Sequence, residues 1–202
     1  MELYLISHEQ FFEGETEIVT ELLAGYDFTF HLRKPGATMD AYKGFLSRIP
    51  SEMHHKIMLH DAYPLSQEFG LKGLHFSTRN RQLRSTFRGH INSTSAHSLV
   101  EVAKLDKLFD YQFLSPVFPS ISKPGYSCKL DLNAVKSYLQ KPRESKIVAL
   151  GGVTEISISL LQKTGFDGAA VLGKVWGNHS ETDTRIHERF YKVYNSVKKA
   201  EQ

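Results

Sequence analysis

The chain has 202 residues, of which 41% are apolar and 23% are charged, so its composition is that of an ordinary globular protein and excludes a disordered or collagen-like one. The formal net charge of +3 is spread along the chain without the dense basic stripe of a nucleic-acid binder. A single cysteine excludes an internal disulfide, the N-terminus lacks a signal-peptide pattern, and no apolar run approaches the roughly 18 residues of a membrane span, so we expect a cytoplasmic protein.

Eight short apolar segments recur along the chain, and an amphipathic stretch follows each of them. In chain order, the expected strands are Leu3–Ile6, Phe28–Leu32, Lys56–Leu59, Gly73–Phe76, Ile91–Ser93, Tyr111–Leu114, Ile147–Leu150 and Ala169–Leu172. The expected helices are Thr16–Ala24, Met39–Arg48, Pro64–Phe69, Arg79–Thr86, Ser98–Lys107, Asp131–Tyr138, Ile156–Lys163 and Thr184–Lys198. The third and fourth of these helices are short and poorly patterned.

Eight strand–helix repeats in this length predict a single-domain (β/α)8 TIM barrel that spans residues 1–202. A doubly wound open sheet is the alternative, because periodicity cannot show whether the sheet closes. In a barrel the functional residues lie at the carboxyl ends of the strands. The candidates found there are His31 and Arg33, His60 and Asp61, His75, Ser95 and His97, Ser120, Ser122 and Lys123, Gly151 and Gly152, and Leu172 and Gly173.

Glycines after the seventh and eighth strands indicate a phosphate site. Gly151-Gly152 and Gly173 each precede a helical segment, and glycine lets an anion approach the backbone N–H groups at a helix N-terminus. Barrels often bind phosphate between these two loops. Plain glycine turns are the alternative interpretation.

The loop FLSPVFPSISKPG (113–125) is predicted to supply the opposite side of an anion site. Ser120 and Ser122 offer hydroxyl groups and Lys123 offers an ammonium group, while three prolines limit the freedom of the loop. The alternative is a solvated surface loop.

These segments carry a family resemblance. SPVFPSISKPG resembles the GP-x-(F/Y)-P-T-x-T-K segment of the thiamine phosphate synthase/TenI family, and FHLRKPG, GLHFS, TSAHS, ALGGV and DGAAVLG resemble its other segments in order. The family contains synthases, which join a pyrimidine diphosphate to a thiazole phosphate with Mg²⁺, and TenI-like tautomerases, which move a proton on a thiazole carboxylate phosphate. Both are (β/α)8 barrels.

The resemblance implies that the substrates contact nine residues, and it leaves open whether the protein is a homodimer. The implied binding residues are Asp61, Ser95, Ser120, Ser122, Lys123, Gly151, Gly152, Leu172 and Gly173.

The chain departs from the synthase pattern at three strand ends. His31 replaces a Gln, His60 replaces an Asn, and Asn80 stands where synthases have a second metal carboxylate. Asp61 remains as a metal ligand, which puts a two-aspartate Mg²⁺ site in doubt. The His-x-Arg after the second strand resembles the tautomerases better.

His97 is the expected proton-transfer residue, with His31 and Arg33 as further catalytic residues. Histidine suits this role because an imidazole titrates near ~6.5. For His75 we expect a structural role. A zinc site formed by the strand-end histidines is the alternative, and no HxH or HExxH spacing supports it.

Three functional hypotheses follow. The first is a TenI-like tautomerase, which requires no cofactor. The second is a thiamine phosphate synthase with an altered Mg²⁺ site. The third is a non-catalytic binder of the phosphate ligand. In each case the partner is a small molecule.

Overall fold

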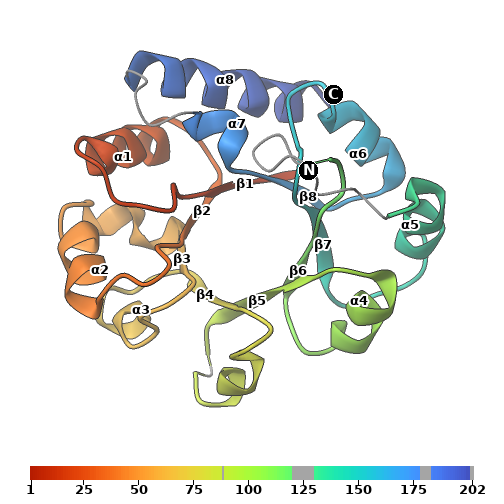
Figure 1. Cartoon of the computed structure of the whole chain (residues 1–202), viewed down its shortest axis with the longest axis horizontal. Helices are drawn as coiled ribbons and strands as arrows, with labels where there is room; N and C mark the ends of the chain where they lie inside the picture. The colour runs from red at the N-terminus through yellow and green to blue at the C-terminus, as the bar shows by residue number, and fades with distance from the viewer. Residues whose placement is uncertain (88, 120–129, 178–182, 201–202) are drawn as a thin grey trace.

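The computed structural model describes residues 1–87, 89–119, 130–177 and 183–200. In this part of the chain, eight parallel strands pair in sequence order, and β8 pairs with β1 to close the barrel (Figure 1). The helices form the outer layer. The predicted (β/α)8 barrel is confirmed, and the open-sheet alternative is wrong.

The strands are short, and all eight lie in one sheet. They are β1 (Glu2–Ile6), β2 (Thr29–Leu32), β3 (Ile57–Leu59), β4 (Gly73–Phe76), β5 (Ile91–Ala96), β6 (Tyr111–Leu114), β7 (Lys146–Ala149) and β8 (Gly168–Val171). The helices are α1 (Glu15–Gly25), α2 (Met39–Leu46), α3 (Leu65–Glu68), α4 (Leu99–Leu105), α5 (Leu132–Leu139), α6 (Ile158–Thr164), α7 (Gly173–Trp176) and α8 (Asp183–Ala200), with 3-10 helices η1 (Ser51–Lys56) and η2 (Arg81–Ser85).

The predicted elements differ from the observed ones where the sequence pattern is weak. The expected helix Arg79–Thr86 is the 3-10 helix η2, in which no residue is buried, so no apolar face holds an α-helix against the barrel. The fifth strand extends beyond the expected Ser93 to Ala96. Leu150 and Leu172 follow β7 and β8 instead of ending them, which leaves both side chains at the mouth.

Alternation along the strands creates two apolar layers. Leu3 and Leu5 point outward and pack with the helices, whereas Tyr4 and Ile6 point into the barrel. The interior cluster also contains Met58, Tyr111, Phe113, Val148 and Ala170. Polar side chains share this interior position near the carboxyl ends of the strands, and they form the site described below.

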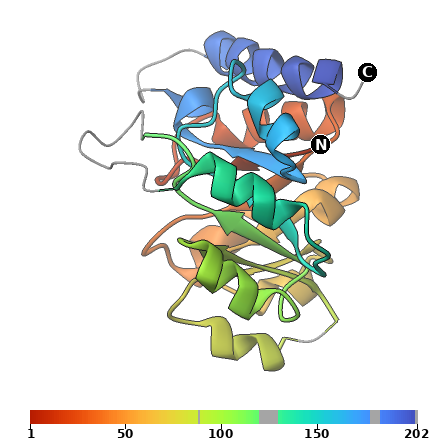
Figure 2. The ribbon, with the colours of Figure 1, turned by 90° about the vertical axis from the view of Figure 1, so that its right-hand side faces the viewer.

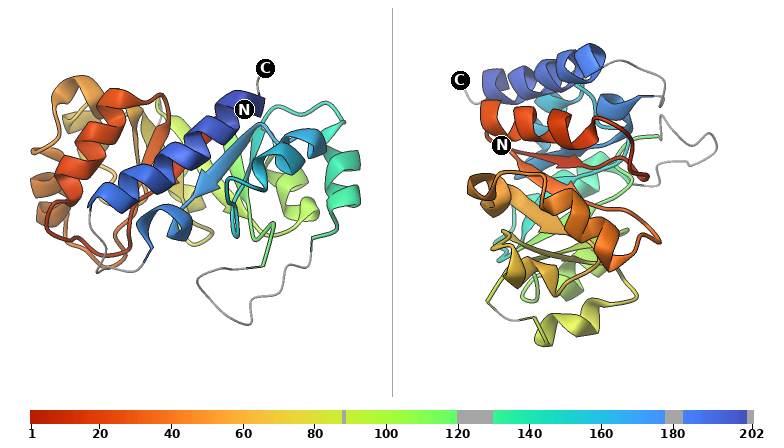
Figure 3. Two further views of the ribbon diagram at one scale, coloured as in Figure 1. Left: turned by 90° about the horizontal axis from the view of Figure 1, so that it is seen from above. Right: turned by 90° about the vertical axis from the view of Figure 1, so that its left-hand side faces the viewer.

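Local signals define the helix ends. Thr38 caps α2, Ser98 caps α4 and Asp131 caps α5, each through a side-chain oxygen that accepts a backbone N–H. The long helix α8 lies on the outside of the barrel against α6, α7 and α1 (Figure 2). The N-terminal end of β1 and the C-terminal end of α8 lie at the same end of the molecule (Figure 3). No helix within the described ranges is long and apolar enough to cross a membrane.

Candidate functional site

A pocket of about 560 Å³ lies at the carboxyl ends of the strands. A larger hollow of about 670 Å³, lined by Glu2, Lys72 and Lys146, lies at the opposite end of the barrel. Parallel barrels carry their chemistry at the carboxyl end, so the smaller pocket is the candidate site. Five of the predicted site residues line it: Arg33, Ser95, His97, Gly151 and Leu172.

The backbone of Arg33 is held in place by two hydrogen bonds with Ser7. The Ser7 hydroxyl accepts a hydrogen bond from the Arg33 N–H at 2.9 Å and donates one to the Arg33 carbonyl at 2.8 Å, which ties the end of β2 to the end of β1. The guanidinium is half-exposed and pairs with Glu9, with Nη1 3.2 Å from Oε1. Glu9 also lines the pocket. An incoming anion would therefore compete with Glu9 for the Arg33 guanidinium.

His97 is an exposed residue held by contacts on two sides. Its N–H donates to the Glu101 carboxylate at 2.8 Å, and Glu101 pairs with the Arg81 guanidinium at 2.8 Å. Its Nδ1 lies 2.8 Å from the Ser115 carbonyl oxygen. A carbonyl can only accept, so Nδ1 donates, and a neutral His97 ring then has a free electron pair on Nε2.

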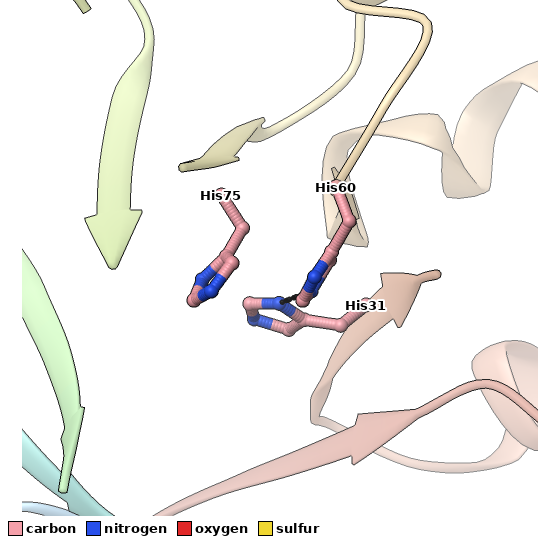
Figure 4. Close-up of side chains that lie close together, drawn as sticks. All are labelled: His31, His60 and His75. Carbon is pink, nitrogen blue, oxygen red and sulfur yellow. Dashed lines mark hydrogen bonds between the residues drawn. The ribbon is translucent and has the colours of Figure 1, made fainter. Parts of the chain in front are cut away.

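Three further histidines lie together beside the pocket; His60 and His75 line it, and the predicted catalytic residue His31 is fully buried behind them. His31 and His75 are buried on β2 and β4, while His60 follows β3 and is partly exposed (Figure 4). Nδ1 of His31 lies 2.9 Å from Nε2 of His60. The His60 and His75 rings stack, with centroids 4.1 Å apart and an interplanar angle of 21°.

Burial keeps these three rings neutral. It lowers the pKa of His31 and of His60 well below 6.5, and neighbouring His75 lowers both further. Burial, with the nearby Arg33 and Arg81 guanidinium groups, lowers the pKa of His75 to about 3. At neutral pH the cluster therefore presents uncharged nitrogens.

One nitrogen from each of these three rings lies within 4.8 Å of the others, which is close enough for the zinc alternative. Both His75 nitrogens are occupied, because Nδ1 bonds to Ser93 at 2.9 Å and Nε2 to Ser95 at 3.1 Å. A ligand ring points its lone pair at the ion in the ring plane, which two nearly parallel stacked rings cannot do toward one ion. The arrangement therefore fits a hydrogen-bonded network better than a coordination sphere.

Asp61 lies outside the pocket lining, on an exposed position next to Arg33. Local burial raises the pKa of its carboxyl group. The nearby Arg33 guanidinium and a hydrogen bond with Tyr42 lower this pKa, but by less. Asn80 is tied to its neighbours, since Nδ2 donates to the Tyr63 hydroxyl at 2.7 Å and Oδ1 accepts from Ser77 at 2.6 Å. Among the residues that the structure describes, no second carboxylate lines the pocket beside Glu9.

The glycines after β7 pack against the loop that follows β6. Gly151 and Gly152 have φ of +93° and +66°, and a Cβ on Gly152 would lie 2.5 Å from the Pro119 carbonyl oxygen. Phe118 N–H donates to the Gly151 carbonyl at 3.0 Å. This packing accounts for both glycines without a ligand, while leaving Gly151 on the pocket wall. Gly152 and Gly173 are absent from the lining, and Gly173 begins α7.

The predicted residues of the loop after β6 cannot be placed. Ser120, Ser122 and Lys123 lie outside the described residues. Lys34, which stands in the His-Leu-Arg-Lys run, points away from the mouth and is buried with Glu15, with Nζ 2.5 and 2.6 Å from the two carboxylate oxygens.

Sequence reasoning missed three residues around the site. Tyr111 hydrogen-bonds to Nε2 of His31 at 2.7 Å, Ser93 bonds to His75, and Glu9 pairs with Arg33. Tyr111 begins β6 and Ser93 lies in the middle of β5, so a search of the residues that follow each strand does not find them. For Tyr111 the available signal was a polar hydroxyl within the buried run YQFL.

Three comparisons relate the chain to known proteins. A family model described as thiamine monophosphate synthase matches residues 3–175. The thiamine-phosphate synthase of Staphylococcus carnosus (strain TM300) is 23% identical over 87% of this chain and 88% of that protein. The thiamine-phosphate synthase of Anoxybacillus flavithermus is 30% identical over 54% of this chain and 48% of that protein. In the first curated relatives the match spans only about half to three fifths of their length.

A solved structure agrees with this result along the whole chain. The thiamine phosphate pyrophosphorylase of Bacteroides thetaiotaomicron superposes with a TM-score of 0.83, covers 98% of both chains and is 27% identical in sequence.

Proposed function

Because the chain belongs to the thiamine monophosphate synthase family, we propose that it is an enzyme of thiamine biosynthesis that binds a thiazole phosphate at the mouth of its barrel. The observation that carries this proposal is the pocket that Arg33, His97 and Gly151 line together. A guanidinium group is suited to phosphate oxygens, and Gly151 adds no side chain to this part of the pocket wall.

The first candidate reaction joins the thiazole phosphate to a pyrimidine diphosphate. The names of the relatives favour it, including those that match over most of their length. Negative charge develops on the departing diphosphate, so the contribution of the protein is mainly electrostatic. Arg33 would supply a compensating positive charge, and Glu9 would give up its ion pair with Arg33 as the diphosphate binds.

Magnesium is the metal that this reaction implies, and it would neutralise charge on the diphosphate. Mg²⁺ is usually held by one or two carboxylates together with substrate phosphates. Asp61 supplies one carboxylate, whereas the amide of Asn80 is already hydrogen-bonded to Tyr63 and Ser77. Asp61 lies outside the pocket lining. Among the described residues it would be the one aspartate able to hold an ion beside the ligand, and these residues do not fit an ion held between two aspartates.

The second candidate reaction moves a proton within a thiazole carboxylate phosphate. The ring nitrogens around the pocket favour it. His97 donates from Nδ1 to Ser115, so its Nε2 can take a proton from the ligand and return it. His60 and His75 line the same pocket. This reaction needs no metal ligand, which agrees with the loss of the second carboxylate.

A product assay tests both candidates on the same preparation. The protein is mixed with pyrimidine diphosphate and thiazole phosphate, with and without Mg²⁺, and separately with the thiazole carboxylate phosphate. Thiamine phosphate formed only with Mg²⁺ would support the joining reaction, with Asp61→Asn expected to lower the rate. Aromatisation of the carboxylate substrate without Mg²⁺ would support proton transfer.

The family relatives supply the control. A thiamine-phosphate synthase that is active under the same conditions shows that the substrates are competent. If this chain then forms neither product while still binding the thiazole phosphate, both catalytic candidates are wrong and the protein is a binder.

A further inference from the structure

The 3-10 helix η2 lies against the barrel without burying any of its own residues, yet it carries one side chain that is largely enclosed. The side chain of Arg81, its first residue, is only 18% exposed. Arg84, on the same helix, instead lies over the Phe109 ring, with the guanidinium carbon 5.6 Å from the ring centroid. The two arginines therefore attach η2 to the barrel in different ways, and Arg81 is the one that reaches the end of β5.

The Arg81 guanidinium holds two neighbouring elements together. Its Nε donates a hydrogen bond to the Thr94 hydroxyl at 2.9 Å, and its Nη2 donates one to the Ser95 carbonyl. The same Nη2 lies 2.8 Å from Oε1 of Glu101. Thr94 and Ser95 lie near the end of β5, whereas Glu101 lies in the first turn of α4. One planar group with several N–H donors thus joins the end of a strand to the start of the following helix.

His97 is part of the short connection between these two elements. The second carboxylate oxygen of Glu101, Oε2, accepts the backbone N–H of His97 at 2.8 Å. Nδ1 of the His97 ring lies 2.8 Å from the Ser115 carbonyl oxygen. Glu101 therefore uses one oxygen for Arg81 and the other for His97, so the guanidinium restrains the carboxylate that restrains the His97 backbone.

Arg81 and Glu101 act from outside the pocket. Neither belongs to its lining, which includes Ser95 and His97. Ala96, between these two pocket residues, is fully buried. Because the Glu101 carboxylate also offsets the charge of the guanidinium, the influence of Arg81 on a ligand in the pocket passes through Ser95 and His97.

The strand end and the helix start each have a local restraint of their own. The Thr94 hydroxyl donates to the Phe76 carbonyl at 2.6 Å, which holds the end of β5 to β4. The Ser98 hydroxyl accepts the Glu101 N–H and caps α4. What the guanidinium adds is a fixed position of the strand end relative to the helix start, and His97 lies between them.

The Glu101 carboxylate is ionised in this arrangement. Local burial acts to raise the pKa of its carboxyl group, but the His97 N–H and the Arg81 guanidinium act against burial, and the pKa lies below its ordinary value. Glu101 therefore keeps both of its contacts at neutral pH.

We propose that Arg81 is a positioning residue, which acts through Glu101 and the end of β5 to hold the His97 ring toward the bound ligand. The inference rests on the proton-transfer candidate proposed above, in which Nε2 of His97 exchanges a proton with the ligand. The rate of such a step depends steeply on position, because a displacement of about 1 Å in a reacting group can cost roughly 10²-fold.

Arg81→Ala tests the proposal, because it removes all three contacts of the guanidinium. Arg84→Ala is the matched control: it removes an arginine from the same helix, and with it the contact to Phe109, but it leaves the ion pair of Glu101 intact. The first measurement is independent of catalysis. In protein labelled with ¹⁵N-histidine, the imidazole ¹⁵N signals show which ring nitrogen carries the proton, and His97→Asn identifies the His97 signals by their loss.

At about pH 8, where an ordinary imidazole is neutral, we expect the wild type and Arg84→Ala to show a His97 ring protonated at Nδ1. In Arg81→Ala the signals should move toward the average of the two tautomers, because the ring leaves the Ser115 carbonyl for part of the time. In turnover of the thiazole carboxylate phosphate, kcat should be at least tenfold lower in Arg81→Ala, with KM within twofold of the wild type, and unchanged in Arg84→Ala. Added to His97→Asn, Arg81→Ala should alter the residual rate less than twofold.

Unchanged His97 signals or an unchanged kcat in a folded Arg81→Ala variant would overturn the proposal. Equal effects of Arg81→Ala and Arg84→Ala would also overturn it, because they would assign the effect to η2 as a whole. A tenfold loss that persists in the His97→Asn background would show that Arg81 does not act through His97.

If Arg81→Ala does not fold, Arg81→Lys gives the same comparison with smaller changes in the same direction. Its ammonium group can pair with Glu101 but lacks the planar fork that also reaches the end of β5. A wild type without proton-transfer activity overturns the proposed function alone, and the His97 signals still decide the role of Arg81.

Discussion

His97 combines an exposed ring with a backbone that is held in place. Glu101 accepts its N–H, and Ser98 caps the helix α4 that follows it, so the position of the ring is set by a helix start. Because Nδ1 is occupied by the Ser115 carbonyl, the ring presents Nε2 to a ligand. We therefore propose His97 as the general acid–base on the exposed side of the pocket.

His97→Asn should preserve the bond to Ser115 through its amide N–H and remove the base. We expect kcat for proton transfer to fall by roughly 10²–10⁴, the range typical of general acid–base groups, with unchanged affinity for thiazole phosphate in calorimetric titration. His55→Asn, at an exposed position of η1, is the control and should have no effect. A turnover rate in His97→Asn equal to that of the wild type would contradict the assignment.

Lys34 follows Arg33 in the sequence but forms a buried ion pair with Glu15 instead of lining the pocket. Its ammonium group and the Glu15 carboxylate are each 1% exposed, and the Phe11 ring centroid lies 4.6 Å from Nζ. Burial raises the pKa of Glu15 to about 7 and lowers the pKa of Lys34, so each charge is costly without the other.

Lys34→Met should leave Glu15 buried without a partner and lower the free energy of unfolding by about 3–5 kcal/mol. Replacing both residues by Met should cost clearly less, because no isolated charge remains. Urea unfolding of the two variants measures the difference. Equal losses of unfolding free energy in the single and double variants would contradict the prediction, because they would show that an unpaired Glu15 carries no extra cost.

At the scale of elements, the loops after β6 and β7 act as one unit. Val117 and Phe118 donate backbone hydrogen bonds to Leu150 and Gly151, and Gly152 leaves no room for a side chain. The shape of the pocket wall at Gly151 therefore depends on the contact between these two loops.

Gly152→Ala should be more destabilising than the same change at another glycine with positive φ. Gly36 has φ of +78°, and an added Cβ there would meet no atom within 4 Å, so Gly36→Ala isolates the backbone strain of about 1–2 kcal/mol. Gly152→Ala adds contacts at 2.5 and 2.6 Å with Pro119 and Phe118. We expect Gly152→Ala to lose more unfolding free energy than Gly36→Ala and to bind thiazole phosphate more weakly. Equal losses of stability in the two variants would show that the loop after β6 moves aside without cost.

At the scale of the whole molecule, neutral histidines inside the barrel link folding to pH. Their pKa values are lowered by folding, so below about pH 6.5 the unfolded chain binds more protons than the folded one. Stability should therefore fall as the pH drops from 6.5, and for His75 the loss continues to about pH 3.

Each such histidine should cost about 1.4 kcal/mol per pH unit below 6.5. Urea unfolding at several pH values, for the wild type and for His75→Gln, measures the contribution of His75. The difference between the two curves cancels other groups, such as Glu15, whose raised pKa acts in the opposite direction between about pH 4.5 and 7. Parallel curves would mean that folding does not lower the pKa of His75.

The sequence by itself determined the eight strand–helix repeats and the strand ends that carry the candidate site. Each strand is a short buried run followed by a helix or a turn. These patterns are local, so they can be recognised without knowing which strands pair with one another. The same counting placed Arg33, His97 and Gly151 at strand ends, and all three line the pocket. The segment η2, with no apolar face, was assigned to the wrong kind of helix.

Only the tertiary structure decided whether the sheet closes and which side chains meet. Tyr111 and His31 are 80 residues apart and touch only because β2 and β6 point both side chains into one barrel. Lys34 follows Arg33 directly but turns to Glu15, since neighbouring residues at a strand end face opposite sides of the sheet. Such pairings depend on register across the closed ring, and spacing along the chain does not encode them.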